Sequence, residues 1–136
     1  RKASSKMYLQ DFSAKIRPRA VISQDSKQIL EFIEQENRPV ILKPLRGTGG
    51  SGVFIVRPND LSNVNQIIEI ISRQDFIIAQ EYLEAGVIGD TRLLLLYGEP
   101  IRVNGEVALV TRLRQGYDLR SNVAVGGKPS RGGYSD

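Results

Sequence analysis

Residues 40–53 read VILKPLRGTGGSGV, and this stretch contains the most informative pattern in the chain. The apolar run predicts a strand over 40–45, and Pro44 places it at a sheet edge or at the strand's end. Four of the six residues from Gly47 to Gly52 are glycine, and strand character resumes over 53–56. Strand, glycine-rich loop and strand predict a hairpin, unlike the strand-to-helix order of a P-loop.

The flanking segments predict one strand and one helix on each side of this hairpin. A β-branched run predicts a strand over 20–23. Asp25 with Gln28 three residues later predicts the start of a helix that runs to about Glu36. Downstream, apolar residues spaced i, i+3, i+4 and i+7 predict a helix over 60–72, and an apolar run predicts a strand over 76–80.

The rest of the chain predicts further strands. Leucine-rich residues 91–97 and residues 101–103 are typical of strands, and Asn104-Gly105 is a strong hairpin signal that returns the chain through 106–113. From Arg114 onward the sequence is polar and glycine-rich. The predicted class is therefore α+β, with two helices packed on a mostly antiparallel sheet.

Composition narrows the chemistry that the chain can perform. The 136 residues are 40% hydrophobic and 25% charged, as in a soluble globular domain, and no apolar run approaches the roughly 18 residues of a membrane span. The chain has no cysteine and no histidine, which excludes thiolate metal sites and Ser-His-Asp catalysis within it. We expect a cytoplasmic protein whose catalysis relies on positioning and charge.

The net charge of +4 is unevenly distributed. Residues 1–19 carry six bases and one acid, and residues 102–131 carry six bases and two acids. A nucleic acid could account for such basic regions, but the aromatic residues are not interleaved with the bases. We therefore predict a polyphosphate ligand, with neither nucleic acid nor membrane as a partner.

Lys43 and the glycine-rich loop are the first candidate site. Glycines allow consecutive backbone N–H groups to turn toward a phosphate, and an amine on the strand that enters the loop would lie beside the same group. The alternatives are a flexible hairpin tip and a lysine that faces water from an edge strand.

Five motifs follow one another along the chain: Val40–Leu45 with the glycine-rich loop, Ile78–Leu83, Gly89–Arg92, Gly98–Pro100, and Arg120–Asn122 with Gly126-Gly127. In kind and order they resemble the bacterial glutathione synthetase branch of the ATP-grasp superfamily. The resemblance implies an ATP-grasp fragment, with a lid-type α+β subdomain over about 20–80 and the start of a second subdomain over about 81–136.

The resemblance also assigns roles to individual residues. Lys6 and Lys43 would contact nucleotide phosphates, and residues 80–83 would form the adenine hinge, whose backbone pairs with the adenine edge. The cofactor-binding set comprises Lys6, Lys43, Gly47, Gly49, Gly50, Ser51, Gly52, Gln80, Glu81, Tyr82, Leu83, Asp90 and Arg112. The catalytic set comprises Arg92, Arg120 and Asn122, and Gly126 and Gly127 belong to a substrate loop. For Arg112 in particular, a solvated surface charge is the competing interpretation.

The implied reaction is ATP-dependent C–N bond formation. ATP would phosphorylate the carboxylate of a γ-glutamyl peptide, and an amine such as glycine would displace phosphate from the acyl phosphate. Lysines, arginines, backbone N–H groups and Mg²⁺ would stabilise the charge in transfer. Because the chain begins at Arg1 and ends at Asp136, we expect a segment that lacks the family's substrate domain and metal-binding strand and is inactive alone. No metal ligands are predicted within it.

Three other functions stay open. Arg120–Asn122 before Gly126-Gly127 also resembles glutamate ligases that extend protein tails. A non-catalytic ATP-binding module and a basic nucleic-acid binder are the other two. The sequence also leaves open whether the protein forms a homo-oligomer.

Overall fold

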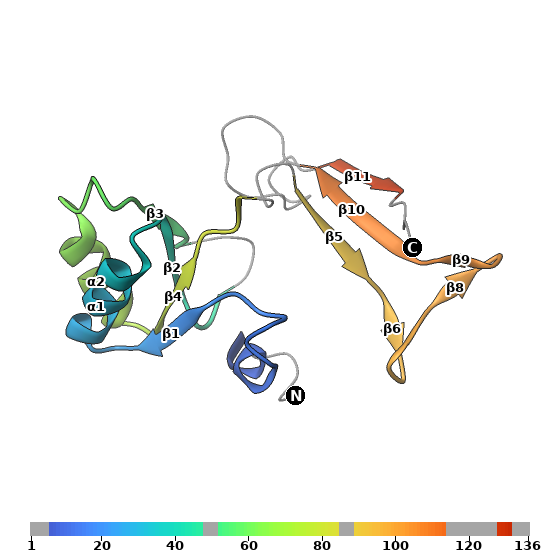
Figure 1. Cartoon of the computed structure of the whole chain (residues 1–136), viewed down its shortest axis with the longest axis horizontal. Coiled ribbons are helices and arrows are strands. Elements are labelled where there is room, and N and C mark those ends of the chain that lie inside the picture. The colour runs from blue at the N-terminus through green and yellow to red at the C-terminus, as the bar shows by residue number, and fades with distance from the viewer. Residues whose placement is uncertain (1–5, 48–51, 85–88, 114–127, 132–136) are drawn as a thin grey trace. The chain divides into compact units, whose positions relative to one another are not determined.

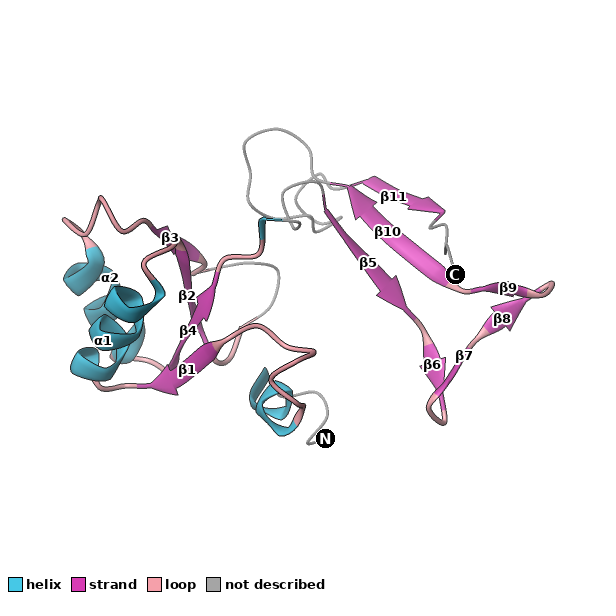
Figure 2. Ribbon diagram, viewed as in Figure 1, coloured by secondary structure: helices cyan, strands magenta, loops and turns pink. Residues whose placement is uncertain are grey.

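The computed structural model describes residues 6–47, 52–84, 89–113 and 128–131. The chain divides into two compact units, Arg1–Leu83 and Glu84–Asp136. Figures 1 and 2 show the elements of both.

The first unit contains a four-stranded antiparallel sheet. Its strands follow the order β1-β4-β2-β3, so that β4 and β2 are the inner strands. The bounds are β1 Ala20–Ser23, β2 Val40–Pro44, β3 Phe54–Val56 and β4 Ile77–Glu81. The pairing of β2 with β3 confirms the hairpin predicted around the glycine-rich loop.

Two helices cover one side of this sheet, as Figure 2 shows. Helix α1, Ser26–Glu36, contacts β1 and β4, and helix α2, Val64–Ser72, contacts β2 and β4. The sheet and its two helices confirm the predicted α+β class. A 3₁₀ helix, Lys6–Asp11, was not predicted.

The core forms between the helices and the facing side of the sheet. Alternate strand residues point to opposite faces of a sheet, so every second residue of β2 and β4 faces the helices. The buried apolar residues that form this core are Ile29, Ile33, Val40, Leu42, Val56, Val64, Ile68, Ile71, Ile77 and Ala79.

The ends of the helices show which start signals can be trusted. Asp25 caps α1, because its carboxylate accepts a hydrogen bond from the Lys27 amide at 2.9 Å. The predicted start of α2 at Asp60 was wrong by four residues. Instead, Arg57 and Asp60 form an isolated bridge, and Asp60 accepts a hydrogen bond from the Ser62 hydroxyl, so the helix begins at Val64.

The second unit is built from strands. A three-stranded antiparallel sheet has the order β11-β10-β5, with β5 Gly89–Leu93, β10 Leu109–Leu113 and β11 Lys128–Arg131. Two short hairpins lie between β5 and β10. They pair β6, Leu95–Leu96, with β7, Glu99–Pro100, and β8, Arg102–Val103, with β9, Glu106–Val107.

Two sequence predictions for this unit have different outcomes. Asn104 and Gly105 have φ angles of 52° and 83°, the left-handed pair of a tight hairpin turn, which confirms the predicted turn. The single strand predicted over 91–97 was wrong. Because Leu94 leaves the ladder and its amide bonds to the Ala108 carbonyl at 3.3 Å, β5 ends at Leu93. Strand β11 was not predicted.

No helix in the described ranges is both long and apolar enough to cross a membrane.

Candidate nucleotide site

Lys43 and Gln80 lie on the sheet face that points away from the helices. Val40 and Leu42 face the core, as do Ile77 and Ala79, so the alternation turns their neighbours Lys43 and Gln80 the other way. Lys43 pairs with Ile78 and Gln80 pairs with Ile41, so the two polar residues are diagonal neighbours on adjacent strands. The Lys43 ammonium donates a hydrogen bond of 2.7 Å to Gln80 Oε1.

Lys6 approaches the same region from the 3₁₀ helix. Its ammonium donates a hydrogen bond of 2.8 Å to the carbonyl of Pro44, the last residue of β2. A cavity of about 30 Å³ lies between the 3₁₀ helix and the sheet. Its polar lining includes Lys6, Gln10, Arg17, Lys43 and Gln80. The structure therefore brings together three predicted residues and adds Gln10 and Arg17.

The electrostatics of this cavity favour an anion. Burial lowers the pKa of Lys43, and the nearby charge of Lys6 lowers it further. Burial also lowers the pKa of Lys6, while the carboxylate of Asp75 opposes that effect. Two partly desolvated cations that destabilise each other would both be stabilised by a phosphate between them.

The segment predicted to be the adenine hinge, residues 80–83, begins inside β4 and leaves the sheet after Glu81. The Glu81 amide donates to the Arg19 carbonyl at 3.0 Å, and the Tyr82 amide donates to the Pro39 carbonyl at 3.0 Å. Both amides are therefore engaged within the protein. The first hinge amide beyond them is that of Leu83, whose side chain is half exposed.

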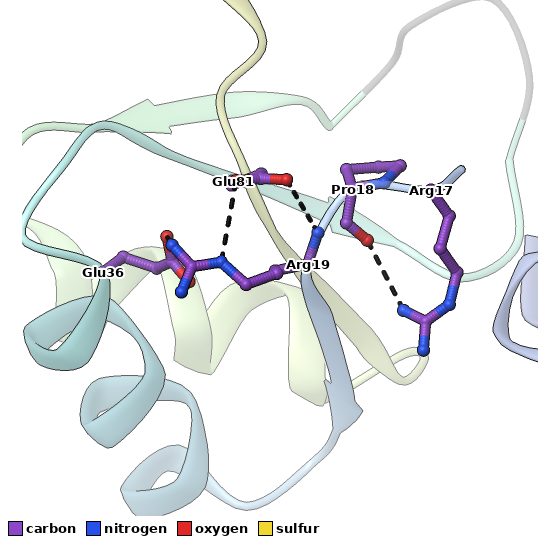
Figure 3. A network of polar contacts seen from close by, with 5 residues as sticks. All are labelled: Arg17, Pro18, Arg19, Glu36 and Glu81. Carbon is purple, nitrogen blue, oxygen red and sulfur yellow. Dashed lines mark hydrogen bonds and ion pairs between the residues drawn. The ribbon is translucent and has the colours of Figure 1, made fainter. Parts of the chain in front are cut away.

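The side chain of Glu81 is held by Arg19, as Figure 3 shows. Glu81 Oε1 accepts a hydrogen bond from the Arg19 amide at 2.9 Å, and Arg19 Nε lies 3.7 Å from Glu81 Oε2. The Arg19 guanidinium also contacts Glu36 Oε2 at 2.6 Å. The sequence predictions missed Arg19 and Glu36. Because Ile29, Ile33 and Glu36 follow helical spacing, the acid on the apolar face of α1 was a signal that could have found the pair.

The two ends of the glycine-rich loop meet at Pro44. Gly47 and Gly52 have φ angles of 125° and 70°, which side chains rarely adopt. A Cβ on Gly52 would lie 3.2 Å from Pro44 Cδ, and one on Gly47 would lie 3.7 Å from Pro44 Cγ. Gly49, Gly50 and Ser51 lie outside the described residues.

The second unit holds two predicted residues that contact each other. Asp90 on β5 pairs directly with Arg112 on β10, and Arg112 Nε donates to Asp90 Oδ1 at 2.6 Å. This hydrogen bond is the main reason why the pKa of Arg112 is raised. Arg92, two pairs further along the ladder, is exposed. Arg120, Asn122, Gly126 and Gly127 lie outside the described residues.

No group of three or more acidic side chains within the described ranges could hold a metal ion. The two ammonium groups of Lys6 and Lys43 are cations that can bind and neutralise phosphate.

Comparison with known proteins supports this chemistry. Residues 5–135 match the family described as prokaryotic glutathione synthetase, ATP-grasp domain. The chain is 38% identical over 130 residues to the glutathione synthetase of Thermosynechococcus vestitus, covering 94% of this chain and 38% of that protein. It is 35% identical over 130 residues to that of Synechococcus elongatus, with coverages of 94% and 38%. It is 33% identical over 133 residues to that of Brucella melitensis, with coverages of 96% and 40%.

The chain spans less than half the length of each of these relatives. The family match nevertheless covers nearly all of it and contains every residue discussed above. The lysine pair, the hinge and the glycine-rich loop thus lie within one recognised domain, and the chain belongs to the prokaryotic glutathione synthetase ATP-grasp domain family.

Proposed function

We propose that this chain is the ATP-binding part of a carboxylate–amine ligase of the glutathione synthetase type. The reaction joins γ-glutamylcysteine to glycine and converts ATP to ADP and phosphate. The observation that carries the proposal is the pair Lys6 and Lys43, two partly buried cations that line one cavity beside Gln80. Family membership and relatives named glutathione synthetase give the reaction class.

In this proposal Lys6 and Lys43 bind the phosphates without giving up their protein partners. Among the residues that the structure describes, each ammonium donates one hydrogen bond to a neutral acceptor, Pro44 O or Gln80 Oε1. An ammonium has three donors, so each lysine can keep its protein partner and still donate to a phosphate oxygen. Gly47 begins the loop whose backbone N–H groups would complete the phosphate site.

In this proposal the hinge, residues 80–83, binds the adenine base. Since the Glu81 and Tyr82 amides already bond to Arg19 and Pro39, we assign the adenine contact to the Leu83 amide and the backbone next to it. Glu81 then acts through its side chain, which fixes the hinge to Arg19. Its role is to position the hinge, and its carboxylate is not used to bind the base.

The reaction requires that the charge on the transferring phosphoryl group is stabilised and that water is excluded from the acyl phosphate. A carboxylate oxygen attacks the γ-phosphorus of ATP and ADP leaves. The amine then attacks the acyl carbon, the C–N bond forms, and phosphate leaves as the amine loses a proton. Mg²⁺ would neutralise phosphate charge when bound. Lys6 and Lys43 stabilise the charge that develops on the transferring group.

Further assignments rest on the family resemblance. We propose a lid-type subdomain over about 20–80 and the start of a second over about 81–136. Arg92, Arg120 and Asn122 would act at the acceptor side, Asp90 and Arg112 would act as a pair near the ribose or the substrate, and Gly126 and Gly127 would cover the acyl phosphate. Mg²⁺ ligands are assigned to segments outside this chain, and the location is cytoplasmic.

The direct test is ADP release by the full-length protein, with γ-glutamylcysteine and glycine added together or singly. The proposal predicts turnover that requires both, and loss of turnover in Lys43→Ala with no loss in Lys27→Ala, whose side chain is exposed. Turnover with glutamate and a peptide tail instead would identify the tail-modifying ligase. ADP affinity without turnover on any acceptor would identify a binding module.

A further inference from the structure

Asp75 lies in the turn between α2 and β4 and is one of the few buried charged residues among those described, with 9% of its surface exposed. Neither the sequence patterns nor the proposed reaction gives it a role. Its carboxylate has two backbone partners. Oδ2 accepts from the Arg46 amide, and Oδ1 accepts from the Phe76 amide at 2.8 Å.

These bonds continue the sheet where Pro44 interrupts it. Proline has no N–H, so β2 loses a donor at its last residue. The Leu45 amide then bonds to the Phe76 carbonyl at 2.8 Å, and the Arg46 amide bonds to the Asp75 side chain. The aspartate therefore replaces the next backbone acceptor and holds the chain up to the residue before Gly47.

The corner that Asp75 fixes also receives Lys6. The Pro44 carbonyl accepts the hydrogen bond from Lys6 Nζ, and the Pro44 ring lies against Gly52. One carboxylate thus determines where the Lys6 acceptor and the entrance to the glycine-rich loop are placed. Asp75 is also close enough to Lys6 to oppose the effect of burial on the pKa of that lysine.

We propose that Asp75 is a positioning residue of the nucleotide site, which fixes the Pro44–Arg46 corner and with it the carbonyl that accepts the hydrogen bond of Lys6. This inference rests on the proposed function, because it assumes that Lys6 binds phosphate. Asp75 itself contacts neither the substrate nor the reacting atoms.

The charged groups around Lys6, within the described ranges, are Asp75 from the turn before β4, Lys43 from β2, and Arg17 from the segment before β1. Asp75 is the only acid among these three. Neutralising Asp75 removes the carboxylate that opposes the effect of burial, so the pKa of Lys6 falls and the lysine loses its proton at a lower pH.

The test compares Mg-ADP affinity over a range of pH in the full-length protein and its Asp75→Asn and Asp75→Ala variants. Asparagine keeps the shape and one acceptor oxygen, so it serves even if the alanine variant fails to fold. Asp60→Asn is the matched control, because Asp60 is exposed and, within the described ranges, its side chain accepts a local bond from Ser62.

We expect Asp75→Asn to weaken Mg-ADP binding about tenfold at neutral pH and to move the alkaline loss of binding to lower pH, with Asp60→Asn unchanged. Wild-type affinity and an unmoved alkaline midpoint would overturn the inference. Weaker binding with an unmoved midpoint would also overturn it, since a role in packing alone has that result. If Lys43→Ala in the same experiment does not weaken binding, the proposed function itself fails.

Discussion

The Lys43 ammonium and the Gln80 side chain form a 2.7 Å hydrogen bond across two adjacent strands of the first unit. A neutral acceptor holds the lysine in place and leaves its positive charge uncancelled. A carboxylate at position 80 would hold it equally well but would neutralise it. The choice of glutamine over glutamate is therefore what a phosphate site requires.

Substitution Gln80→Glu tests this choice. The new carboxylate would raise the pKa of Lys43 and stabilise the nucleotide-free fold, yet it would compete with phosphate for the ammonium. We expect a higher melting temperature together with weaker Mg-ADP binding, measured by thermal unfolding and calorimetry. Tighter binding in the variant would show that phosphate does not approach Lys43.

The pH dependence of stability follows from the lowered pKa of Lys43. Below that pKa, keeping the partly buried lysine charged lowers the free energy of unfolding. As pH rises through the folded-state pKa toward the ordinary value of 10.5, the unfolded chain holds more protons than the folded chain, so the free energy of unfolding rises. Lys43→Met removes this dependence.

We therefore expect Lys43→Met to gain stability relative to the wild type at neutral pH, with a difference that shrinks as the pH rises. Denaturant unfolding between neutral pH and about pH 10, near the ordinary lysine pKa, measures it. Lys27→Met, at a side chain with 82% exposure, is the control and should give no such trend. A gap that widens with pH contradicts the assignment of a lowered pKa.

The Arg19–Glu36 contact can be tested by a double-mutant cycle that measures the free energy of unfolding. The Glu36 side chain is 3% exposed and that of Arg19 is 61% exposed. Arg19→Met leaves a buried carboxylate without its cation, so we expect a loss of about 1–3 kcal/mol, below the cost of breaking a fully buried pair. The double variant Arg19→Met with Glu36→Gln should recover most of it.

Chemical denaturation of the two single variants and the double variant completes the cycle. Additive losses would show that the two residues do not interact. Arg73→Met is a matched control, because Arg73 pairs with Glu69 on the exposed face of α2, with side-chain exposures of 72% and 60%. We expect that variant to change stability by less than about 1 kcal/mol.

Substitutions at Gly52 and Gly105 distinguish the conformational cost of a side chain at positive φ from the cost of its steric contact with Pro44. Both have positive φ, 70° and 83°, but a Cβ meets Pro44 only at Gly52, while nothing lies within 4 Å at Gly105. Gly105→Ala should cost about 1 kcal/mol of stability and leave Mg-ADP affinity unchanged. Gly52→Ala should weaken Mg-ADP binding as well, because it displaces Pro44 and with it the acceptor of Lys6. Equal nucleotide affinities in the two variants would contradict that role for the corner.

The sequence predicts the sheet of the first unit well, because its signals are local. Pro44, the glycine-rich loop and β-branched runs mark where β1, β2 and β3 begin and end, and Asp25 marks α1. The start of α2 was misplaced because Leu61 continues the helical spacing, while local bonds of Asp60 hold that segment in turns.

The second unit was harder to predict. The four consecutive leucines at 93–96 show no alternation of apolar and polar residues, so nothing in the local sequence indicates that β5 ends before Leu94. Strand β11 lies in a polar sequence and depends on pairing with β10, which only the register reveals.

Within the site, the sequence predicts Lys6, Lys43 and Gln80. It does not predict Asp75, which fixes the corner that receives Lys6, or Arg19, which holds Glu81. Asp75, Arg19 and Glu36 act through partners 17 to 62 positions away in the chain. Distances of that kind follow from strand order β1-β4-β2-β3, and no spacing rule gives them. In the sequence alone, the exposed Asp60 and the buried Asp75 cannot be distinguished.

Calorimetric titration of Mg-ADP into the full-length protein, with Lys43→Ala beside Lys27→Ala, tests the nucleotide site most directly. We predict binding by the wild type and by Lys27→Ala, and a loss of at least about tenfold in Lys43→Ala, the scale of one charge-assisted hydrogen bond. Absence of binding by the wild type at millimolar nucleotide, or equal affinity in all three proteins, would contradict the assignment of Lys6 and Lys43 to the nucleotide phosphates.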